Sequence, residues 1–481
     1  MKTISDYRKD LDESKVTSEE LFKVANEKAH KYQEEYNSFV TIIDEYSKED
    51  STSLISGIPY ALKDNFSTKG ILSTSSSNIL KDYVPIYDAT VYKKLKEAGA
   101  VLVGKTVLDE LAMGGTGTTA HTGIVSNPWD KNRQIGGSSA GSAASVALGI
   151  VPFSIGSDTG DSIRKPAAFG GVVGFKPTYG RISRYGLFAF ASSLDHVGCF
   201  ARCVKDCAIV TDILKGKDER DMTSLPDEDI KYTDMLNNDI KGKKLFYIKE
   251  LADLEIYNDA GEETLEILNQ FKQTIEKCKE IGFEVEEISF DEKLLKAIYP
   301  SYMTISCAEA TSNNSNLTGI IFGPRGEGNS IEKIMFDART KGFSELIKRR
   351  FVTGSFILQK ENQEKLFLNA QRVRRLIVDK MTELFKDYDG MILPAQGSVA
   401  PKFKSETVDK LSKRNLILEN HMAIGNFGGF PSITIPCGFV NKMPIGLSIT
   451  GGVKKDLDVL NIAYALESIY SYKGQIAKEV K

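Results

Sequence analysis

Two serine-rich segments carry residues whose types and spacing could do chemistry. Residues 135–149 read IGGSSAGSAASVALG, and residues 156–166 read GSDTGDSIRKP. Small residues at this density let the backbone turn tightly and approach a ligand closely, so that main-chain N–H groups can point at one oxygen atom. A serine hydroxyl in such a turn becomes a nucleophile when a base removes its proton. These segments therefore predict acyl transfer through a serine, and three interpretations compete for its position.

One interpretation places the nucleophile at Ser139. The sequence GSSAG around it matches the G-x-S-x-G pattern of a nucleophile elbow. That motif requires an apolar strand leading into the turn, whereas residues 127–135, NPWDKNRQI, are polar. It also requires a histidine further along the chain, and only two of the four histidines follow.

A second interpretation takes Ser162 and Lys165 as the S-x-x-K pair of penicillin-recognising enzymes. The S-D-N and K-T-G motifs that accompany this pair are absent from the sequence. Lys165 also precedes Pro166, which disfavours a helical backbone at the lysine.

The third interpretation combines both turns with a distant lysine. Ser162 lies in TGDS, where successive N–H groups could face one oxyanion, and Ser138 lies in an equally tight turn. Lys63 directly follows the apolar run IPYAL at residues 58–62. Burial there would lower the pKa of its amine from ~10.4 toward neutrality. A neutral lysine could then act as the base where no histidine serves.

The elements that must position these residues alternate between apolar strands and amphipathic helices. The runs at 58–62, 101–103 and 151–155 predict strands that are buried on both faces, and residues 89–98 predict a helix between the first two. Residues 5–48 are charged, with apolar residues three and four apart, which predicts two helices. We therefore expect an α/β fold with a central mixed sheet covered by helices on both faces.

The rest of the chain continues this alternation. Predicted strands fall at residues 244–249, 283–290, 391–394, 432–436 and 445–450, and predicted helices at 261–281 and 330–385.

Composition and charge exclude several classes of protein. The 481 residues are 41% hydrophobic and 26% charged, near globular averages, which argues against disorder and low complexity. The net charge of −3 gives no basic field that would bind nucleic acid or a membrane by charge alone. Six cysteines are too few for a disulfide framework, and residues 1–15 lack the apolar core of a signal peptide. We expect a cytoplasmic protein.

A histidine and three cysteines between residues 196 and 207 suggest a metal site at first. If Cys199 and Cys207 share a helix, they lie about 12 Å apart along its axis, too far for one tetrahedral zinc. We therefore expect buried cysteines and no metal here. The run Ser312–Asn316, SNNSN, is expected to be a loop.

The longest motifs resemble the amidase signature family. The resemblance rests on GIPYALKDN at 57–65, GGSSAGSAASVALG at 136–149 and GSDTGDSIRKPAAFGGVVGFKPTYGR at 156–181. It extends to YGRISRYGLFAFASSLD at 179–195 and GFPSITIPCGF at 429–439. The similarity covers almost the whole chain.

The resemblance implies a role for each residue of the third interpretation. Ser162 would form the acyl ester, Ser138 would be a bridging serine that follows a cis peptide bond, and Lys63 would be the base. Lys63 would take the proton of Ser138, which takes that of Ser162. The oxyanion would be held by backbone N–H groups, those of Thr159, Gly160, Asp161 and Ser162.

Within the family, the motifs are most similar to the glutamine-hydrolysing subunits of tRNA amidotransferases. Glutamine would then be the substrate, with Arg350 on its α-carboxylate and Glu419 near its α-amino group. This resemblance implies no cofactor on this chain, ATP and Mg on a partner subunit that also holds the glutamyl-tRNA, and a third, small subunit. A stand-alone amidase for other small amides and a non-catalytic scaffold subunit remain as alternatives.

Asp161 departs from the family, which has glycine just before the nucleophile. A carboxylate aimed at the oxyanion would oppose its charge, so we predict that Asp161 points away from the pocket.

Because residues from Lys63 to Arg350 must reach one pocket, we expect a single large domain over residues 51–481. N-terminal helices would precede it within residues 1–50, and residues 225–330, which match the family loosely, would form a more variable segment.

Overall fold

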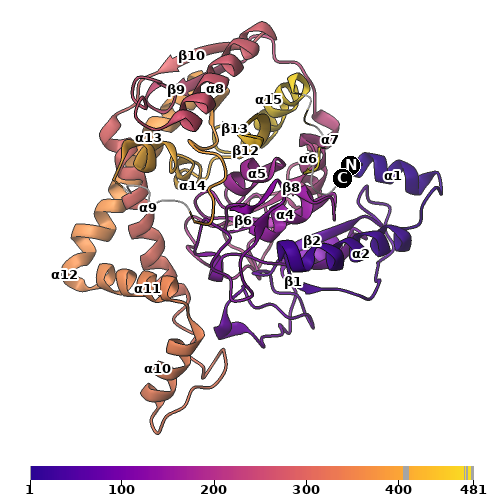
Figure 1. Ribbon diagram of the computed structural model, residues 1–481, viewed down its shortest axis with the longest axis vertical. Coiled ribbons are helices and arrows are strands. Elements are labelled where there is room, and N and C mark those ends of the chain that lie inside the picture. The colour runs from indigo at the N-terminus through magenta and orange to yellow at the C-terminus, as the bar shows by residue number, and fades with distance from the viewer. Residues whose placement is uncertain (1, 405–410, 471, 473–474, 478–481) are drawn as a thin grey trace.

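A long mixed β-sheet forms the centre of the molecule. The computed structural model describes residues 2–404, 411–470, 472 and 475–477. Within them the main sheet has eleven strands in the order β1-β3-β2-β6-β8-β7-β12-β13-β11-β9-β10 (Figure 1). The strands are β1 (Phe39–Ile42), β2 (Pro59–Lys63), β3 (Val101–Thr106), β6 (Phe153–Asp158), β7 (Val173–Lys176), β8 (His196–Ala201), β9 (Lys244–Ile248), β10 (Glu284–Ile288), β11 (Gly390–Pro394), β12 (Ser432–Val440) and β13 (Met443–Thr450). A separate hairpin pairs β4 (Ser126–Asn127) with β5 (Asp130–Gln134).

Helices cover both faces of this sheet. They are α1 (Ile4–Asp12), α2 (Ser18–Tyr36), α3 (Thr90–Glu97), α4 (Ala140–Ala147), α5 (Arg164–Gly170), α6 (Val204–Leu214), α7 (Tyr232–Met235), α8 (Glu262–Glu280), α9 (Glu292–Asn313), α10 (Ile331–Gly342), α11 (Glu345–Leu358), α12 (Lys360–Gln363), α13 (Asn369–Asp387), α14 (Ala423–Phe427) and α15 (Asp456–Ile469). Successive residues of β2 show the two layers: Tyr60 and Leu62 join the core with α6 and α15, whereas Ala61 joins the core with α2 and α4. The α/β fold with a mixed sheet covered on both faces is confirmed.

Parallel pairing brings the ends of the central strands to one edge. β2 runs parallel to both β3 and β6, with Lys63 opposite Thr106 on one side and Leu62 opposite Ile155 on the other. The carboxyl ends of parallel strands meet at the same edge of a sheet, where α/β proteins commonly bind ligands. Lys63 at the end of β2 and the turn after β6 therefore lie at the same edge.

The N-terminal segment differs from the expectation. α2 begins at Ser18, where the Thr17 side chain accepts from the N–H of Glu20 while the Glu20 carboxylate accepts from the N–H of Thr17. The expectation of helices alone over residues 5–48 was wrong, since Phe39–Ile42 form the edge strand β1, antiparallel to β3. Four residues are too few for a strand period to stand out beside a nineteen-residue helix.

The predicted helical stretch at 330–385 is several helices. α10, α11, α12 and α13 follow one another, and α10 to α12 project from the body of the molecule (Figure 1). The 22-residue helix α9 precedes them and contains Pro300, which obscured it in the sequence. Ser312 and Asn313, expected in a loop, are its last two residues.

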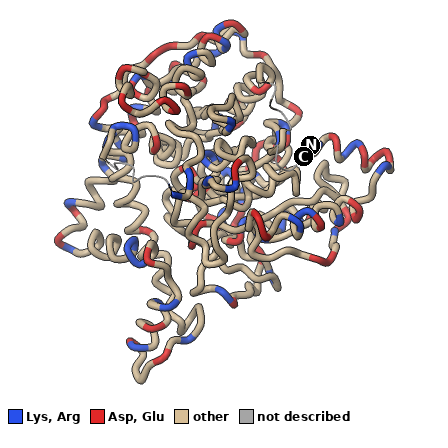
Figure 2. The backbone as a smooth tube through the Cα atoms, viewed as in Figure 1, with Lys and Arg blue, Asp and Glu red and all other residues tan. Residues whose placement is uncertain are grey.

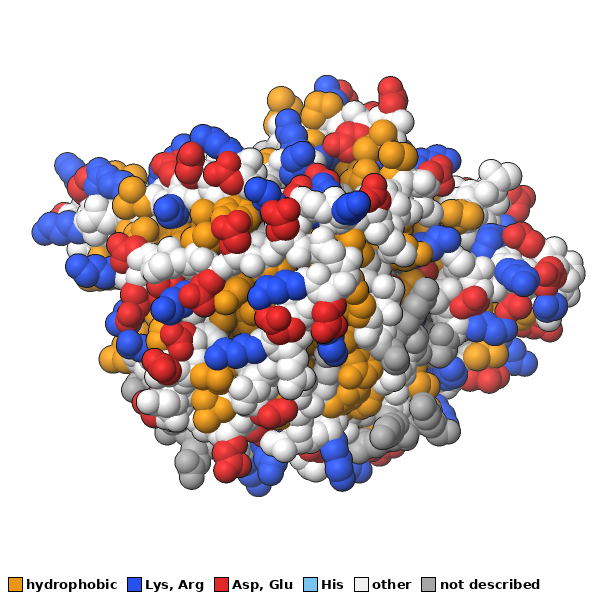
Figure 3. All heavy atoms as spheres, turned by 90° about the horizontal axis from the view of Figure 1, so that it is seen from above, with side chains coloured by type: hydrophobic (Ala, Val, Ile, Leu, Met, Phe, Trp, Pro, Cys, Tyr) orange, Lys and Arg blue, Asp and Glu red, His pale blue; other side chains and the backbone are white. Residues whose placement is uncertain are grey.

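Charged residues of both signs are interspersed along the outer helices (Figure 2). On the face seen from above, basic and acidic side chains alternate with hydrophobic ones, and no single sign dominates (Figure 3). This distribution agrees with the net charge of −3. In the described part of the chain, no helix has the length and apolar character that a membrane crossing needs.

Candidate active site

Lys63 is the last residue of β2 and is fully buried. Burial lowers the pKa of its amine from 10.5 to about 7, although the carboxylates of Asp109, Asp158 and Asp195 act in the opposite direction. The lowered pKa expected from its position after an apolar strand is confirmed. At neutral pH a large fraction of this lysine is therefore uncharged.

The Lys63 amine contacts two serines. Its Nζ lies 2.8 Å from Oγ of Ser138, 2.9 Å from Oγ of Ser157 and 3.3 Å from the main-chain oxygen of Ser157. The side-chain amide of Asn65 donates to the same Ser157 hydroxyl at 3.0 Å. Ser157 therefore fixes the amine from one side, while Ser138 lies on another.

Ser138 follows a cis peptide bond between Gly137 and Ser138, as the resemblance implied. A Cβ atom at Gly137 would lie 2.0 Å from Oδ2 of Asp109, so no larger residue fits there. The Asp109 carboxylate also accepts hydrogen bonds from the N–H groups of residues 116–119, at 3.0 to 3.2 Å. One buried carboxylate thus holds the loop against which the cis turn packs.

The Ser139 hydroxyl is hydrogen-bonded to the main chain. Its hydroxyl donates to the main-chain oxygen of Ser157 at 3.0 Å, and the residue is buried just before α4. The polar residues before it form the hairpin strand β5 and not a buried strand of the main sheet. The geometry therefore disfavours a nucleophile elbow at Ser139.

Ser162 lies in the turn between β6 and α5 and is buried. Its main-chain oxygen accepts from the N–H of Ser139 at 3.3 Å, which joins the two serine turns. Among the described residues, its hydroxyl has no hydrogen-bond partner, and the N–H groups of Gly160, Asp161 and Ser162 donate to nothing. N–H groups without acceptors, next to a hydroxyl that could act as nucleophile, are suited to stabilise the oxyanion that forms when the hydroxyl attacks a carbonyl group.

A buried ion pair holds this turn. Arg164 donates to Asp158 through Nε at 3.2 Å and through Nη2 at 3.0 Å, and Asn426 donates to Asp158 at 2.9 Å. Although burial opposes the effect, Arg164 keeps the pKa of the Asp158 carboxyl well below its usual range. A second anchor is Asp195, which accepts from Oγ1 of Thr159 at 2.6 Å.

Lys165 is ion-paired and protonated. Its Nζ lies 2.5 Å from Oδ2 of Asp161 and donates to the main-chain oxygen of Glu419 at 3.1 Å. Burial would lower its pKa, but the carboxylates of Asp161 and Glu419 raise it above 10.5, so the amine stays charged. This excludes Lys165 as a neutral base for Ser162. The expectation that Pro166 keeps Lys165 out of a helix was wrong, because both lie in the first turn of α5, where proline is tolerated.

Arg350 comes from α11, and its charge acts on the hydroxyl of Tyr302 in α9. Its guanidinium lies over the ring of Phe190, 5.6 Å from the centroid. Its Nε and Nη1 are buried without a hydrogen-bond acceptor in the described part of the chain. The Tyr302 ring lies over Gly160, where a Cβ would be 3.0 Å from the hydroxyl oxygen. Buried donors without acceptors fit a ligand carboxylate.

Glu419 lines a pocket of about 600 Å³ together with Lys165, Tyr299 and Arg414, and neither Lys63 nor Ser162 is among the residues that line it. Its Oε1 is buried without a hydrogen-bond donor among the described residues, and lies 3.6 Å from Nε of Arg414. Neither Arg350 nor Asp161 lines this pocket.

Comparisons with known proteins show the family of this chain. A family model described as "Amidase" matches residues 9–460. The chain belongs to the amidase family. This amidase is 39% identical to a Staphylococcus saprophyticus protein named as the A subunit of glutamyl-tRNA(Gln) amidotransferase, over 99% of this chain and 95% of that protein. A protein of the same name from Agathobacter rectalis is 38% identical, over 99% of this chain and 96% of that one.

A solved structure supports the same relationship. The crystal structure of the A subunit of glutamyl-tRNA(Gln) amidotransferase from Thermotoga maritima superposes with a TM-score of 0.81 at 34% identity. The match covers 100% of the amidase described here and 98% of that chain.

Several residues near Lys63 and Ser162 were not predicted from the sequence. Ser157 and Asn65 stand inside the quoted motifs, so their proximity to Lys63 could have been suspected from those motifs. Asp109 and Tyr302 carry no such local signal, because they reach the site only through the packing of the loop after β3 and of α9.

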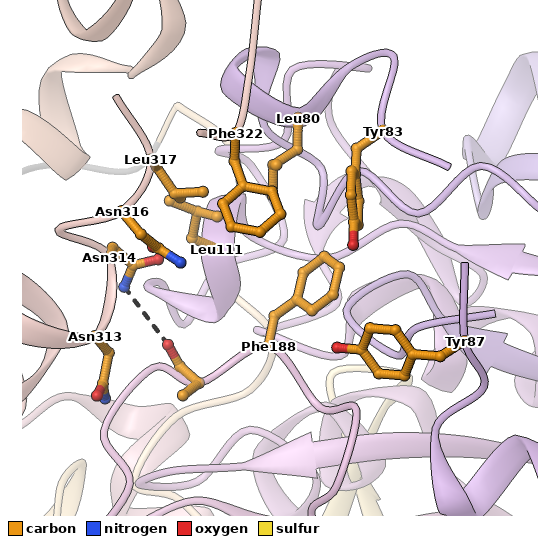
Figure 4. Close-up of a pocket in the computed structure, with 11 residues that line it drawn as sticks. Leu80, Tyr83, Tyr87, Leu111, Phe188, Asn313, Asn314, Asn316, Leu317 and Phe322 are labelled. Carbon is orange, nitrogen blue, oxygen red and sulfur yellow. Dashed lines mark hydrogen bonds between the residues drawn. The ribbon is translucent and has the colours of Figure 1, made fainter. Parts of the chain in front are cut away.

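A second cavity of about 150 Å³ lies outside this site (Figure 4). Aromatic rings of Tyr83, Tyr87, Phe188 and Phe322 form much of its wall, and the side-chain amide of Asn314 donates to the main-chain oxygen of Ala189 beside it. Apart from the tyrosines its lining residues have no ionisable groups, so it offers no general base.

The cysteines near His196 are placed differently from the expectation. Cys199 lies in β8, Cys203 is the N-cap of α6 and Cys207 lies within α6, so the helix spacing assumed for Cys199 was wrong. The Cys199 sulfur lies 4.0 Å from the main-chain oxygen of Cys207. All six cysteines of the amidase are free thiols. No cluster of three or more potential metal ligands occurs among the residues that the structure describes.

Proposed function

We propose that this chain is the A subunit of a glutamyl-tRNA(Gln) amidotransferase, the one that hydrolyses glutamine to supply ammonia. The observation that carries the proposal is the contact of the buried, low-pKa amine of Lys63 with Ser138, in the turn whose next residue, Ser139, donates to the main-chain oxygen of Ser162. The near full-length similarity to proteins of that name supports the same conclusion.

The proton relay follows from the hydrogen-bonding capacity of a neutral amine, which has two N–H donors and one lone pair. The Lys63 donors face the two oxygen atoms of Ser157, and the lone pair then accepts the proton of Ser138. Ser138 in turn accepts the proton of Ser162, whose oxygen attacks the side-chain carbonyl carbon of glutamine.

The C–N bond then breaks, and the relayed proton leaves with the nitrogen as ammonia. A glutamyl ester of Ser162 remains. Water attacks this ester by the same relay, gives glutamate and restores the Ser162 hydroxyl. The N–H groups of Thr159, Gly160, Asp161 and Ser162 would stabilise the oxyanion in both steps.

The two ends of glutamine have candidate partners. The buried Nε and Nη1 of Arg350 have no acceptor among the described residues, and we assign them to the α-carboxylate. The buried Oε1 of Glu419 has no donor there, and we assign it to the α-amino group. An amidase for simple amides would have no need of either group.

The proposal places the remaining chemistry on two other proteins. The B and C subunits of the amidotransferase would complete a heterotrimer, in which the B subunit uses ATP and Mg to activate Glu-tRNA(Gln) and holds the tRNA. The net charge of −3 and the interspersed surface charges of this chain fit a protein that is not the main tRNA-binding surface. No cofactor is assigned to this chain.

One experiment separates this proposal from the two alternatives. The purified chain is incubated with glutamine and with simple amides, alone and with the B and C subunits, and released ammonia is measured. Ammonia release from glutamine that depends on the partners is the expected result, and Ser162→Ala should abolish it. Turnover of simple amides without partners would instead indicate a stand-alone amidase, and no turnover under any condition would indicate a scaffold role.

A further inference from the structure

Lys165 connects two parts of the site that are distant in the sequence. Its Nζ pairs with the carboxylate of Asp161, in the turn before the candidate nucleophile, and donates to the main-chain oxygen of Glu419, at the candidate α-amino end of the substrate. The side chains of Lys165 and Asp161 are only 14% and 20% exposed. Water and salt therefore screen this ion pair weakly.

The charge of Asp161 requires such a partner. Asp161 contributes one of the unused N–H groups of the turn, so its carboxylate lies on the same short segment that would hold the oxyanion. At an effective dielectric constant of about 20, an uncompensated carboxylate roughly 6 to 12 Å from a developing negative charge would slow its formation by roughly 10- to 100-fold. The adjacent ammonium of Lys165 cancels most of this field.

The backbone geometry keeps the two groups together. Asp161 and Lys165 are four residues apart, and the main-chain N–H of Lys165 donates to the main-chain oxygen of Asp161 at 2.9 Å. The ion pair thus spans the first turn of α5, whose position is fixed by the buried Arg164. From there Lys165 also reaches the segment of Arg414 to Glu419, which belongs to another part of the sequence.

We propose that Lys165 is a positioning residue for glutamine hydrolysis, which neutralises Asp161 beside the oxyanion and fixes the Glu419 backbone at the α-amino end of the substrate. The inference rests on the proposed function and adds a residue to its site. The two contacts have separable consequences. Neutralisation of Asp161 acts in the transition state and so affects kcat, whereas the contact with Glu419 acts on the bound substrate and so affects KM.

The test is a double-mutant cycle in the complex reconstituted with the B and C subunits. Lys165→Met should lower kcat for glutamine hydrolysis by about 30-fold and raise KM. Adding Asp161→Asn to Lys165→Met should restore kcat to within about 3-fold of the wild type, because no carboxylate remains to be neutralised, while KM stays raised. If Lys165 had a purely structural role, the second substitution would not restore kcat while leaving KM raised.

The chain offers a matched control. Asp337 and Lys341 on α10 form an ion pair with the same four-residue spacing, 3.0 Å long and outside the site. Lys341→Met should leave both kcat and KM unchanged. Thermal unfolding of each variant shows whether it is folded, and Lys165→Gln gives the same comparison if the methionine variant does not fold.

Two results would overturn the inference. A Lys165→Met complex with kcat within 2-fold of the wild type would do so, and so would a double variant whose kcat stays as low as that of Lys165→Met. A wild-type complex that releases no ammonia from glutamine would overturn the proposed function as well, so the two failures are distinct.

Discussion

The Nζ atom of Lys63 lies 2.8 Å from the Oγ atom of Ser138, although 75 positions separate the two residues in the chain. Both residues are buried, and the lysine has lost most of its solvation. Their contact places a base of nearly neutral pKa next to a hydroxyl that a cis peptide bond presents.

Glutamine hydrolysis should rise with pH through about 7 and level off above it. The pKa of Lys63 is lowered to about 7 by burial, and only the neutral amine accepts a proton. Activity is therefore lost as the pH falls below 7 and Lys63 becomes charged. The pH dependence of kcat/KM between pH 5.5 and 9, which reports the free enzyme and is measured in the reconstituted complex, checks this, and a flat profile over that range would contradict it.

Removing the Ser157 hydroxyl should slow catalysis without weakening substrate binding. Its oxygen lies 2.9 Å from Nζ of Lys63 and holds the amine in place. Loss of one such hydrogen bond, about 1 to 1.5 kcal/mol, should lower kcat roughly 10-fold in Ser157→Ala and leave KM within about 2-fold. The steady-state rate of ammonia release gives both constants.

Ser154 on the same strand provides the matched control for Ser157. It is buried, and its hydroxyl donates to the main-chain oxygen of Ser142 at 2.7 Å, away from Lys63. Ser154→Ala should cost similar stability but keep kcat. Equal losses of kcat in both variants would show that any buried hydrogen bond of β6 matters and that Ser157 has no special role.

Arg350→Met should raise KM for glutamine by about 100-fold and change kcat little. Its two buried nitrogens would otherwise bind the α-carboxylate with charge-assisted hydrogen bonds of about 1.5 to 3 kcal/mol. The neighbouring Arg349 is exposed, and within the described part of the chain its side chain donates one hydrogen bond, to the main-chain oxygen of Glu345, so Arg349→Met is expected to behave like the wild type. Unaltered glutamine affinity in Arg350→Met would remove Arg350 from the site.

Breaking the buried Asp158–Arg164 ion pair should destabilise the fold. Arg164→Met would leave the Asp158 carboxylate buried without its main partner, at a cost of about 3 to 5 kcal/mol in the free energy of unfolding. Because the pKa of Asp158 is held below its usual range, the contribution of the pair is present at neutral pH and is lost as the pH falls. Urea unfolding at pH 7 measures this difference.

The exposed pair of Arg372 and Glu364 is the comparison for the buried one. Its atoms are 2.6 Å apart, but the side chains are 60% and 63% exposed, so water screens the interaction. Arg372→Met should cost less than about 1 kcal/mol. A loss of similar size in Arg164→Met would mean that the buried network adds no more stability than a surface pair.

The sequence was informative wherever a local pattern has a physical cause. Apolar runs of three to five residues predicted β2, β3 and β6 because strands covered on both faces need apolar residues throughout. The position of Lys63 after such a run predicted its lowered pKa for the same reason. Residue spacing wrongly suggested a helix at Cys199, which lies in a strand. It also gave no sign of the strand Phe39–Ile42, whose pairing partner is more than 60 residues away.

The sequence by itself determined the fold class, the motif residues Lys63, Ser138 and Ser162, and the family. Only the tertiary structure decided which groups meet: Lys165 with Asp161 and Glu419, and Tyr302 with Gly160. The physical reason is that hydrophobic periodicity and turn chemistry act between near neighbours in the chain. Ion pairs and contacts across the site instead depend on where the sheet order and the packing of α9, α5 and the segment before α14 place each side chain.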